Sequence, residues 1–206
     1  MRKYITELIG TFFLVLVIGM SGSAGNLAPL AIGATLMVMI FAGGHISGGH
    51  YNPAVTIAVF IRGKISITDV IAYLIVQVAG AALAAMLATW LAGDIIGVPV
   101  GMPDTTRGLV AELTGTFALA YVVLNVATAK GTNGNSFYGL AIGFTVLAMA
   151  YAFGGISKGA FNPAVAIGLS VMKIAPWSDQ WVYMAGCFGG SILAGIIFRI
   201  NNPDDK

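Results

Sequence analysis

Six long apolar blocks, separated by short polar segments, constrain this chain more than any other feature of its sequence. Such blocks suit helices that cross a hydrocarbon layer of about 30 Å. Only 9% of the residues are charged and 58% are hydrophobic, which leaves too little charge to cover a soluble domain. We therefore expect an all-α membrane protein with six transmembrane helices. The blocks are Tyr4–Met20, Pro29–Gly43, Val70–Leu91, Leu109–Ala129, Phe137–Phe153 and Trp181–Ile200.

The basic residues indicate how the chain is oriented. Six crossings place both termini on one side, together with the segments 62–69 and 130–136. Of the 10 basic residues, only Arg107, Lys158 and Lys173 fall on the opposite side. The positive-inside rule therefore predicts that both termini are cytoplasmic, in a plasma or inner membrane. The net charge is only +2 and dispersed, so no nucleic-acid partner is expected.

The two halves of the sequence resemble each other. The segment around Glu7 matches the segment around Glu112, 105 residues later, and 46–55 matches 156–165, 110 residues later. Three crossings separate equivalent points, and an odd number of crossings inverts the second copy. We expect one transmembrane channel domain over 1–206, made of inverted repeats at approximately 1–100 and 105–206.

Each repeat also contains an apolar stretch that is too short to cross the membrane. Pro53 to Ile61 and Pro163 to Val171 would each form about 13 Å of helix, which is close to half a bilayer. The glycine-rich approaches, Gly43–Gly49 and Gly154–Gly159, are expected to be irregular backbone at membrane depth. Such backbone is tolerated where protein buries it or where it lines a wet cavity. The pattern therefore predicts two re-entrant half-helices beside a pore.

The two short stretches begin with the same motif, Asn52-Pro53-Ala54 and Asn162-Pro163-Ala164. Asn is a preferred helix cap and Pro a preferred first residue, so one copy alone would be an ordinary helix start. Inversion brings both helix N-termini, each with about half a positive charge, together at the midplane, where cations are disfavoured. If the Asn oxygens cap their own helices, the amide N–H groups face the pore and orient passing water against proton hopping.

Two further groups of residues follow from this arrangement. Glu7 and Glu112 lie in apolar spans, where an ionised carboxylate is costly. We expect each to be buried and to accept hydrogen bonds from the irregular backbone of its own half. The backbone carbonyls of the approaches would line the pore as acceptors, namely those of Gly48, Gly49, His50, Gly159, Ala160 and Phe161.

The sequence resembles the aquaporin and aquaglyceroporin family over essentially its whole length. The resemblance rests on the paired Glu7 and Glu112 segments, on the run from Gly44 to Thr56, and on the second Asn-Pro-Ala at 162–164. It implies six spans with two half-helices, one pore in each protomer, and a homotetramer.

One group of positions departs from the family pattern. The family usually carries an arginine after the second Asn-Pro-Ala, where this chain has Val165. The resemblance places the rest of this outer filter at Ile32, Ala150 and Gly159, so all four residues are apolar. A constriction without side-chain donors selects by size and dewetting, and we expect it to be wide. Lys158 either returns a positive charge to the mouth or is a solvated loop lysine.

These features favour a passive channel for water or small uncharged solutes such as glycerol, ammonia or a dissolved gas. Two alternatives stay open: a coupled transporter, since inverted repeats also serve alternating access, and a non-conducting structural membrane protein. An enzyme is not expected, because the two histidines, Cys187 and the carboxylates form no nucleophile and base constellation. No metal or cofactor is predicted, and the expected partners are the solute and the lipid bilayer.

Overall fold

The computed structural model describes residues 1–93 and 99–205, and these residues contain six long helices and two nine-residue helices. The expected membrane fold is confirmed, and both short helices have the predicted bounds. Five helical stretches are long and apolar enough to cross a membrane, and the first, Arg2–Ser47, contains two of the long helices. The helices are α1 (Arg2–Met20), α2 (Ala28–Ser47), α3 (Pro53–Ile61), α4 (Ile67–Ala92), α5 (Thr105–Val123), α6 (Tyr138–Ser157), α7 (Pro163–Val171) and α8 (Gln180–Asn201).

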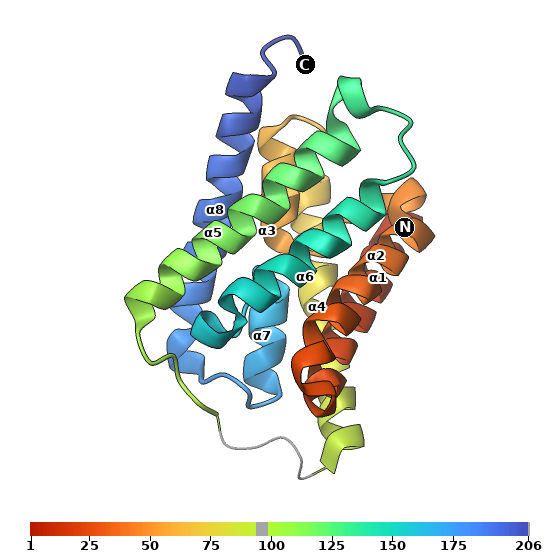
Figure 1. Cartoon of the computed structure of the whole chain (residues 1–206). Helices are drawn as coiled ribbons and strands as arrows, with labels where there is room; N and C mark the ends of the chain where they lie inside the picture. The colour runs from red at the N-terminus through yellow and green to blue at the C-terminus, as the bar shows by residue number, and fades with distance from the viewer. Residues whose placement is uncertain (94–98, 206) are drawn as a thin grey trace.

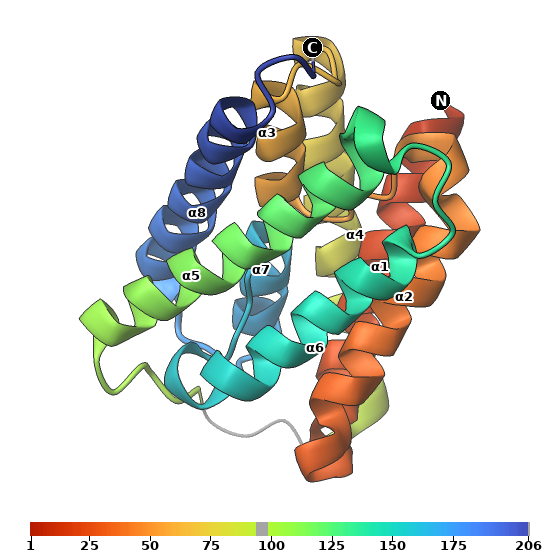
Figure 2. The ribbon, with the colours of Figure 1, turned by 45° about the horizontal axis from the view of Figure 1, so that its top comes forward.

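The helices pack in the same way in each half. Helix α1 packs on α4 and α5 packs on α8, while α2 and α6 cross between the halves (Figure 1). Each half-helix lies against a long helix of the other half, α3 on α8 and α7 on α4. Both termini lie at one end of the molecule, which we call the terminal side, and the opposite end is the far side (Figure 2). The two repeats are therefore interlocked around the half-helices.

Glycines allow the closest of these crossings. A Cβ atom on Gly80 would lie 2.5 Å from the carbonyl oxygen of Leu8, and its counterpart Gly190 meets a backbone carbonyl of α5 in the same way at 2.3 Å. Gly33 and Gly143, which are 110 residues apart, would each meet the other's carbonyl oxygen, at 2.6 and 2.5 Å. The small residues expected to permit close helix packing do so in both repeats.

The irregular approaches to the half-helices are shorter than the sequence indicated. Helix α2 continues through its glycines to Ser47, and α6 continues to Ser157. At membrane depth a helix satisfies every backbone group, so it persists until a residue must turn away. That residue is Gly48 (φ 90°) in the first repeat and Lys158 (φ 71°) in the second, both left-handed. Only about four residues then lead into each half-helix.

A buried arginine joins three segments on the terminal side. Arg62, which is 6% exposed, follows α3 and forms an ion pair with Asp205 in the segment after α8. Its guanidinium also donates to the carbonyl of Thr128 (3.4 Å) and lies 4.9 Å from the Phe198 ring centroid. Asp205 accepts from the backbone N–H of Lys130 at 2.7 Å. These contacts fix the loop after α5 against the first half-helix.

Candidate pore and its lining residues

A buried carboxylate holds the approach to α3. Glu7 Oε1 accepts from the Ser47 hydroxyl (2.6 Å) and the backbone N–H of His50 (3.0 Å). Its Oε2 accepts from the backbone N–H of Tyr51 (2.6 Å) and from Gln77 Nε2 (2.9 Å). Because all four partners donate, the geometry suits an ionised carboxylate, whose charge the hydrogen bonds stabilise. Glu7 therefore contacts the irregular backbone in the expected way.

The second repeat has a similar but weaker arrangement around Glu112. Its Oε1 accepts from the Ser157 hydroxyl (2.6 Å) and the backbone N–H of Ala160 (2.9 Å). Its Oε2 accepts from the backbone N–H of Phe161 (2.7 Å). The fourth contact is the thiol of Cys187 at 3.6 Å, a weak donor in the place where the first repeat has an amide.

The two asparagines cap their own half-helices. Asn52 Oδ1 accepts from the backbone N–H of Ala54 at 2.8 Å, and Asn162 Oδ1 accepts from that of Ala164 at 2.9 Å. Each oxygen also receives a longer contact of 3.4 Å from the next residue. Pro53 and Pro163 occupy the first helical positions, where no backbone N–H is needed. This is the capping that the sequence indicated.

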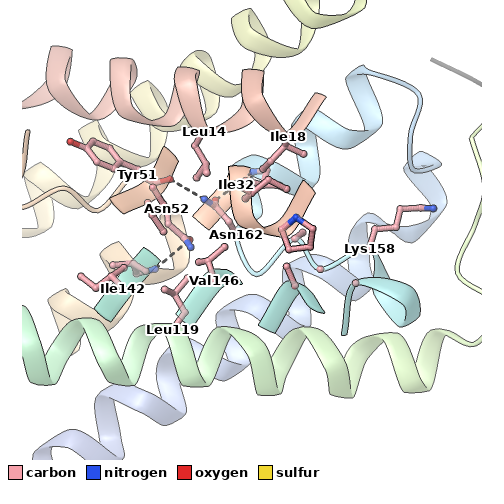
Figure 3. Close-up of a pocket in the computed structure, with 18 of the residues that line it drawn as sticks. Leu14, Ile18, Ile32, Tyr51, Asn52, Leu119, Ile142, Val146, Lys158 and Asn162 are labelled. Carbon is pink, nitrogen blue, oxygen red and sulfur yellow. Dashed lines mark hydrogen bonds between the residues drawn. The ribbon is translucent and has the colours of Figure 1, made fainter. Parts of the chain in front are cut away.

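The amide nitrogens differ from the expectation, because they are not wholly free. Asn52 Nδ2 donates to the carbonyl of Phe161, and Asn162 Nδ2 donates to the carbonyl of Tyr51, both at 2.9 Å (Figure 3). Each asparagine therefore bonds the residue before the other asparagine. The Phe161 carbonyl, expected as a free pore acceptor, has this partner because inversion brings the two approaches into contact. One N–H of each amide remains for a passing molecule.

A cavity of about 190 Å³ lies beside the asparagines. Figure 3 shows Asn52 and Asn162 with apolar side chains on two sides of them. The opposite wall consists of the backbone approaches, including Gly49, His50 and Ala160, whereas Gly48 borders a second cavity instead. The apolar wall residues include Leu14, Ile18, Leu119, Ile142 and Val146.

All four outer-filter residues line this same cavity: Ile32, Ala150, Gly159 and Val165. None has a side chain that forms hydrogen bonds. A solute at this level therefore meets methyl groups and backbone rather than a guanidinium.

Lys158 lies at the far-side end of the same cavity. Figure 3 shows its side chain well away from the asparagines. The residue is half-buried, so the structure places its charge at the rim of the cavity rather than at the midplane.

A second cavity, of about 440 Å³, opens on the terminal side. Its wall includes charged residues such as Lys3, Lys64 and Asp69. His50 and Val123 line both cavities. Together the two cavities follow a path from Lys158 on the far side, past the asparagines, to the terminal side.

Two half-helices that meet end to end beside such a path can be compared with known families. Residues 1–198 match the family model described as Major intrinsic protein. The chain belongs to the major intrinsic protein family. It is 34% identical over 219 residues to "Glycerol uptake facilitator protein-like 6" of Lactiplantibacillus plantarum, with 100% of both chains covered. It is 33% identical to a "Probable aquaporin TIP-type" of Medicago truncatula, with 97% of this chain and 86% of that protein covered.

Solved structures support the same fold. The aquaglyceroporin from Plasmodium falciparum superimposes on this major intrinsic protein with a TM-score of 0.83 and 22% identity, and 98% and 97% of the two chains are covered. An FNT family ion channel superimposes with a TM-score of 0.61 at 15% identity.

Sequence reasoning missed two contributors to the site. The Tyr51 carbonyl accepts the second asparagine, and Thr56 hydrogen-bonds both His50 and Gln77. A signal for Tyr51 existed, since it stands 110 residues before Phe161 and both have positive φ, 48° and 47°. The Thr56 contacts have no counterpart, because the equivalent residue in the second repeat is an alanine.

Proposed function

We propose that this major intrinsic protein is a passive channel for water and small uncharged solutes such as glycerol, ammonia or a dissolved gas. The observation that carries the proposal is the single cavity that contains both asparagines and the whole apolar outer filter. A filter without side-chain donors cannot replace the hydration shell of an ion. Uncharged solutes that fit then pass, and the filter selects them by size.

The paired half-helices supply the barrier to cations. Each N-terminus carries about half a positive charge from its helix dipole, and both lie at the asparagines. The remaining N–H of each amide donates to the oxygen of a passing water or alcohol. The hydrogens of that molecule then point away from the midplane, which interrupts a continuous chain for proton hopping.

The proposal includes the setting of the channel. One domain over 1–206, made of the inverted repeats, lies in a plasma or inner membrane with the terminal side in the cytoplasm. Seven of the 10 basic residues belong to that side, as the positive-inside rule requires. A homotetramer with one pore per protomer is the assembly that the family resemblance implies. In this setting the chain acts as a channel and not as an enzyme.

The test is stopped-flow light scattering on proteoliposomes under water, glycerol and ammonia gradients. Val165, which is 3% exposed, is changed to Arg to restore the donor and narrow the filter, and we expect glycerol flux to fall by about tenfold. Val165→Met is the matched control, because it adds length without charge or donors, and we expect a smaller fall. Unaltered glycerol flux in Val165→Arg would show that the outer filter does not limit passage.

The same preparation separates the channel from its alternatives. A channel gives flux that rises linearly with the solute gradient. A coupled transporter gives flux that saturates and responds to an ion gradient. A non-conducting structural protein gives no permeability above that of empty liposomes.

A further inference from the structure

The two cavities meet at one pair of residues. His50 and Val123 are the only residues that border both the far-side and the terminal-side cavity in the described part of the chain. They are 8% and 7% exposed. The outer filter, by contrast, lies wholly within the far-side cavity and does not divide it. The passage is therefore divided on the terminal side of the asparagines.

His50 is held in place from three directions. Its backbone N–H donates to Glu7 (3.0 Å), and its Nδ1 lies 3.0 Å from the Thr56 hydroxyl. Its ring also meets the ring of Tyr73 edge-on, with centroids 5.2 Å apart. A ring restrained at its backbone, its nitrogen and its edge keeps a fixed position, as a size filter requires.

The hydrogen bonds of Thr56 indicate which ring nitrogen is an acceptor. The hydroxyl donates to the carbonyl of Asn52 (3.0 Å) and accepts from Gln77 Nε2 (3.1 Å). With its one proton used on Asn52, the hydroxyl accepts from His50 Nδ1. Nε2 of the neutral ring is then an acceptor beside Gly48, since a Cβ on Gly48 would lie 3.1 Å from it.

Val123 forms the other side of the division. It is the last residue of α5, and a π-helical turn, Leu124–Thr128, follows at once. Such turns frequently occur at functional sites, where they change the direction of side chains. Leu119 lies one turn earlier on the same face of α5 but borders only the far-side cavity.

The inverted half has no such division. The residue 110 positions after His50 is Ala160, and the residue 105 positions before Val123 is Ile18. Both lie within the undivided far-side cavity. A histidine has replaced a small residue on one side only, so the two halves of the passage differ in width and polarity.

We infer that His50 and Val123 form an inner filter, which sets the largest solute that passes and presents the Nε2 acceptor to a small hydroxylated or amine-bearing solute. The inference rests on the proposed channel function. It makes the terminal-side pair, rather than the apolar outer filter, the determinant of solute size. Solutes with hydrogens to donate, such as short polyols, then pass more easily than apolar solutes of the same width.

The experiment compares glycerol with its four-carbon and five-carbon polyol homologues in proteoliposomes. Val123→Ala widens the inner filter, and we expect the ratio of four-carbon to three-carbon flux to rise by about threefold or more, in line with the discrimination that one carbon unit gives. His50→Ala should raise the ratio in the same direction. Leu119→Ala is the matched control, and with Val165→Ala it should leave the ratio nearly unchanged. Val123→Phe should reduce glycerol flux while water still passes.

The outcomes separate this inference from the proposed function. If the unmodified protein conducts neither water nor glycerol above empty liposomes, the channel function itself fails. If it conducts, and Val165→Ala changes the ratio while Val123→Ala and His50→Ala do not, the inner filter is wrong. Size-exclusion profiles that match the unmodified protein establish that each variant is folded.

Discussion

Replacement of Glu112 by glutamine tests whether a buried carboxylate organises the second half-helix. Glu112 is fully buried, and the new amide loses least if its nitrogen takes the place of Oε2. The backbone N–H of Phe161 then faces a donor, and an unsatisfied buried N–H costs about 1–3 kcal/mol. The bonds from Ser157 and Ala160 change from charge-assisted to neutral, which adds about 1–2 kcal/mol. Relief of the buried charge offsets part of this, so we expect a net destabilisation of about 3 kcal/mol.

The measurement is thermal unfolding of the purified protein in detergent, followed by tryptophan fluorescence. For a chain of this size 1 kcal/mol corresponds to about 2–4 °C, so the Glu112→Gln midpoint should fall by about 6–12 °C. Ser157→Ala removes one hydrogen bond to the same carboxylate and should lower the midpoint by less. A Glu112→Gln midpoint within about 2 °C of the unmodified protein would refute the assigned role.

Three further changes test other parts of the structure. Gly190→Ala places a Cβ 2.3 Å from a backbone carbonyl of α5, so it should push α8 away and cost about 1–3 kcal/mol, measured as a lower unfolding midpoint. Lys158→Ala should raise proton or cation leak in proteoliposomes if the rim charge repels cations; Lys173→Ala on the same side is the control, and equal leak in both would contradict the role. The backbone N–H of Lys130, with nearby basic side chains, lowers the pKa of Asp205. Its carboxylate therefore stabilises the fold above the ordinary aspartate pKa of about 3.9 and loses that effect as the pH falls through the lowered value; the midpoint difference between the unmodified protein and Asp205→Asn should be present at pH 7 and vanish in acid.

Much of the fold follows from the sequence alone. The half-helices begin at Pro53 and Pro163 and end where expected, because an Asn-Pro start and a short apolar run are local signals. The helices α2 and α6 extend further than expected. Glycine interrupts helices in water, but in a membrane a helix is the simplest way to pair the backbone, so local composition misplaced these ends.

The site was less accessible to sequence reasoning. The capping of each half-helix by its own asparagine is a contact over two residues, and spacing alone predicts it. The bond from Asn52 to Phe161 spans 109 residues and depends on how the two halves meet. The π-helical turn after Val123 has no Gly or Pro to mark it, and without it the division at His50 is not visible in the sequence.

The crossed bonds between the asparagines and the opposite approaches also bear on how the protein is made. The first repeat leaves the ribosome before the second, and until Phe161 is in the membrane the Asn52 amide lacks its partner. Asn162 in turn finds the Tyr51 carbonyl only when α3 is already in place. The pore motifs are thus completed together, as a late step in biogenesis. Two separately expressed halves, each with one motif, would acquire a finished midplane only by assembling with one another.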